Sequence, residues 1–151
     1  MKRQSFYVSV LMLFASLMVG ALPATALAQQ YLGEFCWETT ETGATMPTGL
    51  VRLDVHMQAG GTYSLVGTME DFPFGVVNVV NGSAEILPTG ATLIPTVSAT
   101  LVGSNPAGFA MINLQLDPTT FDGSSTGIVF LTQPSLMSQT TASAMALVAC
   151  P

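Results

Sequence analysis

The sequence predicts an all-β fold, a single antiparallel up-and-down β-barrel of about eight strands. Apolar and polar residues alternate with a period of two in many short segments, whereas helical periodicity is almost absent. Turn-forming residues separate these segments at short intervals, which is typical of a sandwich or a barrel. Two cysteines, Cys36 and Cys150, stand near the two ends of the predicted domain. A bond between them would make the first and last strands neighbours.

The first 28 residues have the features of a secretory signal peptide. A short positive start, Lys2-Arg3, precedes an apolar stretch over residues 6–22, and Ala26-Leu27-Ala28 matches a cleavage site. The apolar stretch is shorter than the roughly 20 residues that a membrane-spanning helix needs. We therefore expect a cleaved signal over residues 1–28 and one domain over residues 29–151. We also expect export to the periplasm or the extracellular space of a bacterium.

The strand pattern is clearest over residues 50–57, where Val51, Leu53 and Val55 alternate with polar neighbours. Gly60-Gly61 separates two such segments and predicts a hairpin, and Asn81-Gly82 predicts a two-residue hairpin between two others. Further turns are expected at Asp117-Pro118 and Asp122-Gly123. Strands are expected over residues 31–38, 50–57, 62–69, 76–80, 83–87, 92–102, 109–116, 126–131 and 142–150. Pro95, inside one of these strands, predicts an edge or a bulge.

The cysteines supply the argument for closure. An even number of cysteines in an exported protein indicates a disulfide, and two cysteines permit one internal pairing. Two free thiols or an intermolecular bridge are the alternatives. Adjacent first and last strands in an up-and-down sheet close a barrel, although a sandwich whose terminal strands meet is a competing geometry. If Phe35 and Trp37 fill the interior, alternation places Cys36 on the outer wall.

Charge excludes two classes of function. Residues 29–151 carry Arg52 as the one basic residue against all nine acidic residues, a formal net charge of −8. Nucleic-acid binding requires clustered Lys and Arg to neutralise phosphates. Attraction to an anionic membrane surface also requires a basic patch. The sequence therefore predicts neither nucleic-acid binding nor anionic-membrane binding, and it leaves the oligomeric state open.

A family resemblance rests on the first predicted strand, Gly33-Glu34-Phe35-Cys36-Trp37. An exported antiparallel barrel of this size with a Gly and a Trp on its first strand resembles the lipocalin and avidin group, the calycins. In that group the motif is Gly-x-Trp, whereas three residues separate Gly33 from Trp37 here. The resemblance implies that a small apolar ligand binds inside the barrel. The chain also resembles small exported bacterial proteins of unassigned function.

The sequence offers little that indicates catalysis or a metal. His56 is the one histidine, and a metal site usually needs several His or Cys ligands. Asp54 and His56 share a strand face, and Ser64 is expected across the hairpin, but no Gly-x-Ser-x-Gly motif is present. A polar outer strand face is the favoured interpretation. We therefore predict no catalytic residues, no metal, no cofactor and no enzymatic activity.

Aromatic side chains are the candidates for ligand binding. They could line an internal cavity or fill a solid core, and the filled core is the favoured one of these two arrangements. Two of them flank Pro73 in a predicted loop and could form a lid, a contact patch or packing under the barrel end. The candidate cavity-lining residues are Phe35, Trp37, Tyr63, Phe109, Phe72 and Phe74.

The predicted function is an exported, non-enzymatic β-barrel that binds a small apolar ligand or a partner surface. The alternative is a structural or surface-interaction protein with a solid core and no ligand cavity. An outer-membrane barrel is a weaker alternative because no aromatic girdles are visible in the sequence.

Overall fold

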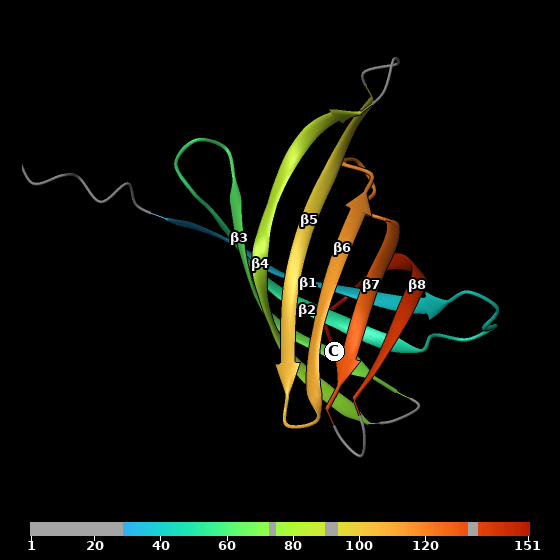
Figure 1. The fold of residues 1–151 in the computed structure, drawn as a ribbon. Helices are drawn as coiled ribbons and strands as arrows, with labels where there is room; N and C mark the ends of the chain where they lie inside the picture. The colour runs from blue at the N-terminus through green and yellow to red at the C-terminus, as the bar shows by residue number, and fades with distance from the viewer. Residues whose placement is uncertain (1–28, 73–74, 90–93, 133–135) are drawn as a thin grey trace, which may run out of the picture.

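A computed structural model of the chain describes residues 29–72, 75–89, 94–132 and 136–151. The expected signal peptide, residues 1–28, lies outside the described residues. Eight antiparallel strands follow one another in chain order and close into a barrel, as Figure 1 shows. They are β1 (Gln30–Glu41), β2 (Gly49–Met57), β3 (Tyr63–Asp71), β4 (Val76–Thr89), β5 (Ile94–Asn105), β6 (Gly108–Leu116), β7 (Gly123–Leu131) and β8 (Met137–Val148). The prediction of an all-β, up-and-down barrel is confirmed.

Period-two alternation builds the walls of the barrel. In β6, Ala110, Ile112 and Leu114 are buried, whereas Phe109 and Met111, which alternate with them, are exposed. Successive side chains of a strand point to opposite faces, so the apolar sets of most strands meet inside the barrel, whereas the inward face of β8 carries Thr141 and Ser143 beside Met145. The interior is therefore mainly apolar. Within the described residues, no helix reaches the length and hydrophobicity that crossing a membrane would require.

The Gly60-Gly61 hairpin forms as predicted between β2 and β3. Both glycines have positive φ angles, 97° and 83°, a backbone region that glycine adopts without a steric penalty. The Gln58 amide donates to the Thr62 carbonyl oxygen at 2.8 Å, which closes the turn. The hairpin lies at one end of the barrel, beside the start of β3 (Figure 1).

The predicted hairpin at Asn81-Gly82 is wrong, because β4 continues through both residues. Asn81 pairs with Val66 of β3 on one side and with Val102 of β5 on the other. Gly82 does not form a turn. It allows the backbones of β4 and β5 to approach closely, since a Cβ atom there would lie 1.9 Å from the Thr100 carbonyl oxygen. A glycine inside a strand often marks such a close backbone approach.

The β4–β5 hairpin extends beyond its neighbours at the same end of the barrel (Figure 1). The β3–β4 ladder ends at Tyr63 and Ala84, and the β5–β6 ladder ends at Val97 and Leu116. Pro95 pairs with β4 alone, so it lies on an edge as its sequence context predicted. A proline is tolerated there because its missing amide interrupts no further ladder.

The disulfide joins the first and last strands, as predicted. Cys36 and Cys150 are bonded with their Cα atoms 5.2 Å apart. Cys36 alternates with the inward-facing Phe35 and Trp37 and therefore belongs to the outer wall, yet it is fully buried. The C-terminus lies beside it, since Arg52, the partner of Cys36 in the β1–β2 ladder, donates from Nη2 to the Pro151 carbonyl oxygen at 3.4 Å. The sandwich alternative is not adopted.

Candidate functional site

The barrel interior divides into two halves that differ in packing. In the half near the β1–β2, β3–β4, β5–β6 and β7–β8 connections, which we call the filled half, side chains occupy the space between the walls. Its apolar members are Val51, Met69, Val80, Leu101, Ala110, Ile112, Val129 and Met145. Asn105 Nδ2 donates to Asn78 Oδ1 at 2.6 Å, so the buried amide of Asn78 has a partner.

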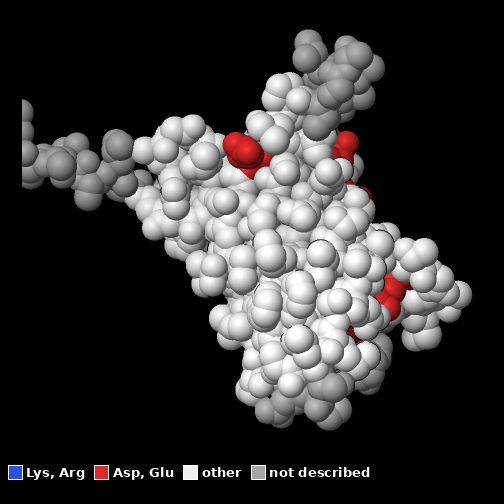
Figure 2. Space-filling model, viewed as in Figure 1, with Lys and Arg blue, Asp and Glu red and all other residues white. Residues whose placement is uncertain are grey.

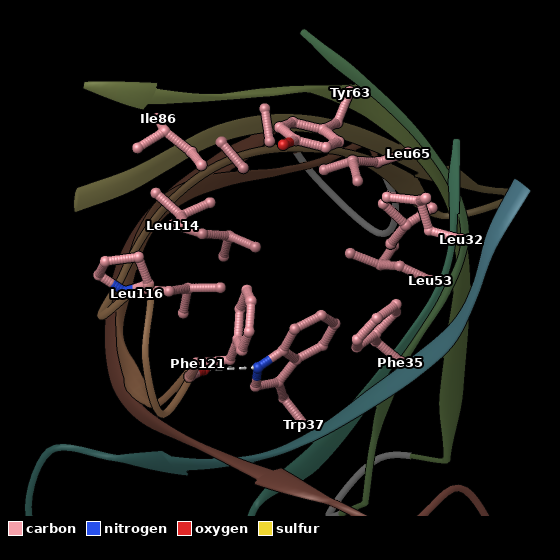
Figure 3. A pocket seen from close by; sticks show the side chains of 15 residues that line it. Leu32, Phe35, Trp37, Leu53, Tyr63, Leu65, Ile86, Leu114, Leu116 and Phe121 are labelled. Carbon is pink, nitrogen blue, oxygen red and sulfur yellow. Dashed lines mark hydrogen bonds between the residues drawn. The ribbon is translucent and has the colours of Figure 1, made fainter. Parts of the chain in front are cut away.

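The other half, which we call the pocket half, contains a cavity of about 180 Å³. Figure 3 looks into it and shows side chains from several strands pointing toward one central space. The lining is almost entirely apolar and comes from β1 to β6 and the β6–β7 loop. It consists of Leu32, Phe35, Trp37, Leu53, Val55, Tyr63, Leu65, Ala84, Ile86, Val97, Ala99, Leu114, Leu116, Pro118 and Phe121. The favoured expectation of a wholly filled core therefore holds for one half of the barrel and not for the other.

Three aromatic rings form the floor of the pocket. The Phe35 and Trp37 ring centroids lie 6.1 Å apart at an interplanar angle of 21°, and those of Phe35 and Phe121 lie 6.2 Å apart at 45°. Leu32 and Ile86 lie at the mouth, where they are 41% and 49% exposed. The cavity is therefore deep and aromatic at one end and open to solvent at the other.

A β-bulge turns Leu32 into the pocket. Tyr31 pairs with His56 and Gly33 pairs with Val55, so Leu32 is an extra residue in the β1–β2 ladder. Gly33 has a φ of 138°, which an L side chain rarely adopts. Bulges commonly redirect a side chain next to a functional site. Without this bulge, regular alternation would point Leu32 outward and Tyr31 into the barrel.

The β6–β7 loop, residues 117–122, closes the side of the pocket. The Asp117 carboxylate accepts hydrogen bonds from the Thr119 and Thr120 amides at 2.7 and 3.1 Å. These bonds favour the charged form, so they lower the pKa of Asp117 below its usual 3.8. The loop holds Phe121 at a φ of 59°, which is uncommon for a bulky residue and is a conformation that the surroundings must stabilise.

Two hydrogen bonds tie this loop to the rest of the barrel. Trp37 Nε1 donates to the Phe121 carbonyl oxygen at 2.8 Å, drawn as a dashed line in Figure 3. The Leu147 amide of β8 donates to Asp122 Oδ1 at 2.9 Å. The loop is needed because the β1–β8 ladder runs only from Cys36 to Glu41 on the β1 side. Between the start of β1 and Cys36, no ladder joins β1 to β8. The loop and the disulfide close the barrel wall there instead.

Two side-chain groups supply the polarity of the pocket, namely the Trp37 indole and the Tyr63 hydroxyl. The indole nitrogen is engaged by Phe121. Tyr63 begins β3 at the mouth, and Figure 3 shows its hydroxyl oxygen at the edge of the ring of lining side chains, on the side of Ile86. Among the described residues, the structure gives this hydroxyl no hydrogen-bond partner, and it is only half-buried.

Charge lies outside the pocket, on the outer wall of β1 and β2. Arg52 Nε is 3.5 Å from Glu34 Oε1, and the Tyr31 hydroxyl donates to Asp54 Oδ1 at 2.9 Å. The hydrogen bond to Asp54 raises the pKa of Tyr31 above its usual 10.0, because deprotonation would break the bond and place two negative charges together. In Figure 2, red acidic atoms appear at the rim of the front wall and its centre is white.

The outer wall brings Ser64 opposite His56 in the β2–β3 ladder, as the sequence predicted. The His56 ring packs against Tyr31, with centroids 5.1 Å apart, and Asp54 accepts its hydrogen bond from Tyr31. The three side chains therefore share a wall without the Ser–His–Asp hydrogen bonds of a catalytic triad. Among the described residues, no cluster of three or more His, Cys, Asp and Glu side chains could hold a metal ion.

Of the six predicted lining residues, the structure brings together Phe35, Trp37 and Tyr63. Phe109 lies elsewhere: it is 44% exposed on the outer wall, where its ring stacks on Phe130 with centroids 4.7 Å apart. Since Ala110 faces inward, alternation along β6 turns Phe109 outward. Phe72 is 46% exposed just after β3, at the end opposite the pocket. Phe74 lies outside the described residues.

An apolar patch occupies the outer wall of β4 to β7. Val102, Met111 and Ile128 are consecutive partners across three strands, and all three are exposed. Val79 and Phe109 lie in the neighbouring row, separated by Ser104. We call these five apolar residues the outer patch. Exposed apolar patches of this kind often mark contact surfaces.

Comparisons with known proteins assign no family. No family model matches the chain, and neither the curated proteins nor the solved structures include a significant match. What the barrel can do must therefore be argued from its own residues.

Proposed function

We propose that this protein is an exported, non-enzymatic binding protein that holds a small apolar ligand in the pocket half of its barrel. The observation that carries the proposal is the pocket itself, a cavity of about 180 Å³ whose lining is apolar apart from two side-chain groups. A dry apolar cavity of about 150 Å³ is large enough to bind benzene. The pocket therefore suits a single ring or a short branched chain.

The distribution of polarity supports this proposal. The pocket half of the interior is apolar, whereas the outer wall of β1 and β2 carries Glu34, Arg52 and Asp54. Porin-type membrane barrels have the reverse arrangement, with a polar interior and an apolar outer band. The inward-facing Trp37 on the first strand supports the proposed resemblance to calycins. The Cys36–Cys150 bond is typical of non-reducing compartments and so supports export.

The test is saturable binding that depends on the cavity. Ethylbenzene is titrated into the purified protein while the emission of Trp37, the one tryptophan, is recorded. Ala99→Leu places a larger side chain in the pocket, since Ala99 lines it. Ala146→Leu adds the same atoms at an exposed position of β8 and is the matched control. Circular dichroism checks that each variant is folded.

We expect ethylbenzene to bind the wild-type protein and Ala146→Leu equally, and to bind Ala99→Leu at least tenfold more weakly. The expectation follows from overlap between the added side chain and the ligand, because packed interiors tolerate little extra volume. Failure of ethylbenzene to saturate any signal in the wild-type protein would contradict the proposal. Equal binding to Ala99→Leu and the wild-type protein would place the ligand elsewhere.

A second candidate function is surface contact through the outer patch. It is favoured by the exposure of Phe109 and Met111 on a wall whose centre has no charged side chain in Figure 2. Analytical ultracentrifugation of the wild-type protein and Met111→Ser tests it. A concentration-dependent dimer that Met111→Ser dissociates supports surface contact. A monomer at all concentrations counts against self-association through this patch.

A further inference from the structure

The Tyr63 hydroxyl is the feature of the pocket that the proposed function does not use. Tyr63 lines the pocket, and its hydroxyl oxygen lies at the edge of the ring of lining side chains (Figure 3). The other polar side-chain group, Trp37 Nε1, is already bonded to the Phe121 carbonyl oxygen at 2.8 Å. Tyr63 thus offers a hydrogen-bonding group to an occupant of the pocket, whereas Trp37 does not.

When a ligand covers this hydroxyl, the polar atoms of the ligand determine whether the hydroxyl stays hydrogen-bonded. Tyr63 is half-buried at the mouth of the pocket, where water is the available partner for its hydroxyl. An occupant without a polar atom would displace that water and leave the hydroxyl unpaired, which is costly in an apolar site. An occupant with one suitably placed oxygen restores the hydrogen bond. The pocket therefore discriminates between ligands of the same shape by the presence of one oxygen.

Charge narrows the ligand class further. Arg52, the one Arg or Lys of residues 29–151, lies on the outer wall with Glu34 and the Pro151 carbonyl oxygen. A carboxylate or phosphate in the pocket would find no cation and would meet the field of an acidic protein. No acidic residue lines the pocket, so an ammonium group would also be buried without a partner. The occupant is therefore uncharged.

Size and shape complete the argument. The volume of about 180 Å³ and the floor of Phe35, Trp37 and Phe121 suit one flat ring with a short substituent. Aromatic side chains pack well against a flat ring in offset or edge-to-face arrangements. The Tyr63 hydroxyl lies at the mouth, so the oxygen of the ligand belongs at the end opposite the floor.

We propose that the pocket selects an uncharged, single-ring compound that carries one hydroxyl or carbonyl oxygen, and that Tyr63 binds this oxygen. This inference rests on the proposed function and adds the chemical class of the ligand. Tyr63 acts as a specificity-determining residue. Its hydroxyl favours the binding of oxygen-bearing ligands and disfavours the binding of the matching hydrocarbon, which would leave the hydroxyl unpaired.

Three probes of similar shape test the proposal by isothermal titration calorimetry at pH 7: ethylbenzene, 4-ethylphenol and 4-ethylbenzoate. The variant Tyr63→Phe removes one oxygen atom and keeps the ring. Tyr31→Phe removes a phenolic oxygen from the outer wall and is the matched control, since Tyr31 bonds Asp54 there. Comparing variants for each probe cancels the different hydration of the three compounds, as in a double-mutant cycle.

We expect Tyr63→Phe to weaken 4-ethylphenol binding by about five- to tenfold, as loss of one hydrogen bond predicts. Ethylbenzene binding to Tyr63→Phe should become tighter, by about threefold or more, because no hydroxyl is left unpaired. 4-Ethylbenzoate should not bind, and Tyr31→Phe should match the wild-type protein. If Tyr63→Phe affects both neutral probes equally, the role of Tyr63 is overturned while the proposed function stands. If 4-ethylbenzoate binds as tightly as 4-ethylphenol, selection for an uncharged ligand is overturned. If no probe binds the wild-type protein, both proposals fail.

Discussion

The filled half and the pocket half use the same eight strands, but they are closed in different ways. In the filled half, a hydrogen-bonded ladder joins β1 to β8 from Cys36 to Glu41, and buried side chains pack behind it. In the pocket half, β1 continues without β8. A disulfide, the Trp37–Phe121 hydrogen bond and the Asp122–Leu147 hydrogen bond close the gap.

This difference shows how a small barrel can be hollow at one end. Packed apolar side chains stabilise the filled half through burial and dispersion, which an empty cavity forgoes. The pocket half instead depends on a few specific links, each of which can be removed separately. The predictions below remove them one at a time, beginning with the largest expected effect.

The disulfide should have the largest effect. In the chain-entropy model, a crosslink between residues separated by 114 positions stabilises the fold by about 4 to 5 kcal/mol. We expect Cys36→Ala/Cys150→Ala to lose about that free energy of unfolding, measured by urea denaturation. Amide exchange should accelerate first in residues 31–35, which have no β8 partner. Uniform acceleration over all eight strands would contradict the difference between the halves.

Matched leucine substitutions compare the packing of the two halves directly. Leu101 is fully buried in the filled half, whereas Leu116 is buried on the wall of the pocket. We expect Leu101→Ala to cost about 3 kcal/mol of unfolding free energy, within the usual range for buried leucines. Leu116→Ala should cost about half as much, because one side of Leu116 already faces the cavity. Equal costs, measured by urea denaturation, would indicate that the pocket wall is packed as tightly as the core.

Removing the indole donor should loosen the β6–β7 loop. Trp37→Phe keeps an aromatic ring on the pocket floor but leaves the Phe121 carbonyl oxygen without its donor. We expect a loss of about 1 to 2 kcal/mol, as for one part-buried hydrogen bond together with some packing. Circular dichroism follows the unfolding, since the variant has no tryptophan. Faster amide exchange at residues 119–122, with β6 unchanged, would locate the effect in the loop.

Acid should produce the smallest and most local effect. The pKa of Asp117 is lowered in the folded protein by the Thr119 and Thr120 amides. The stabilisation is therefore complete above 3.8, the usual pKa, and is lost as the pH falls through the lower value of the folded state. We expect the Thr119 and Thr120 amide resonances to titrate with a midpoint below 3.8. A midpoint at or above 3.8 would show that the carboxylate does not hold the loop.

Most of the fold could be predicted because the signals that determine it are local and periodic. Alternation along β2 and β6, glycines at the β2–β3 turn and two terminal cysteines are sufficient for a closed barrel. Asn81-Gly82 misled the prediction because the same dipeptide serves two purposes. A hairpin uses its positive φ angles, whereas β4 uses the missing Cβ atom of Gly82 to approach Thr100.

The candidate site could be predicted only where it follows strand alternation. Phe35, Trp37 and Tyr63 face inward on regular strands, and each lines the pocket. Leu32 reaches the pocket through a bulge, and Phe121 reaches it from a loop with a positive φ angle. Neither arrangement leaves a periodic pattern in the sequence. The cavity itself depends on how the small side chains of β4 and β5 meet the larger ones of β1 and β6, which spacing alone does not encode.

The pairing of the first strand with the last also determines when the barrel can form. β1 gains its second neighbour only after β8 is available, more than 100 residues later in the chain. Contacts over such separations slow folding, because loop-closure entropy is lost before the contacts form. Until then β1 and β7 both present unpaired strand edges that can pair with other chains. By pairing with both edges, β8 therefore protects the protein from aggregation. A chain that lacks β8 is expected to polymerise through these two edges.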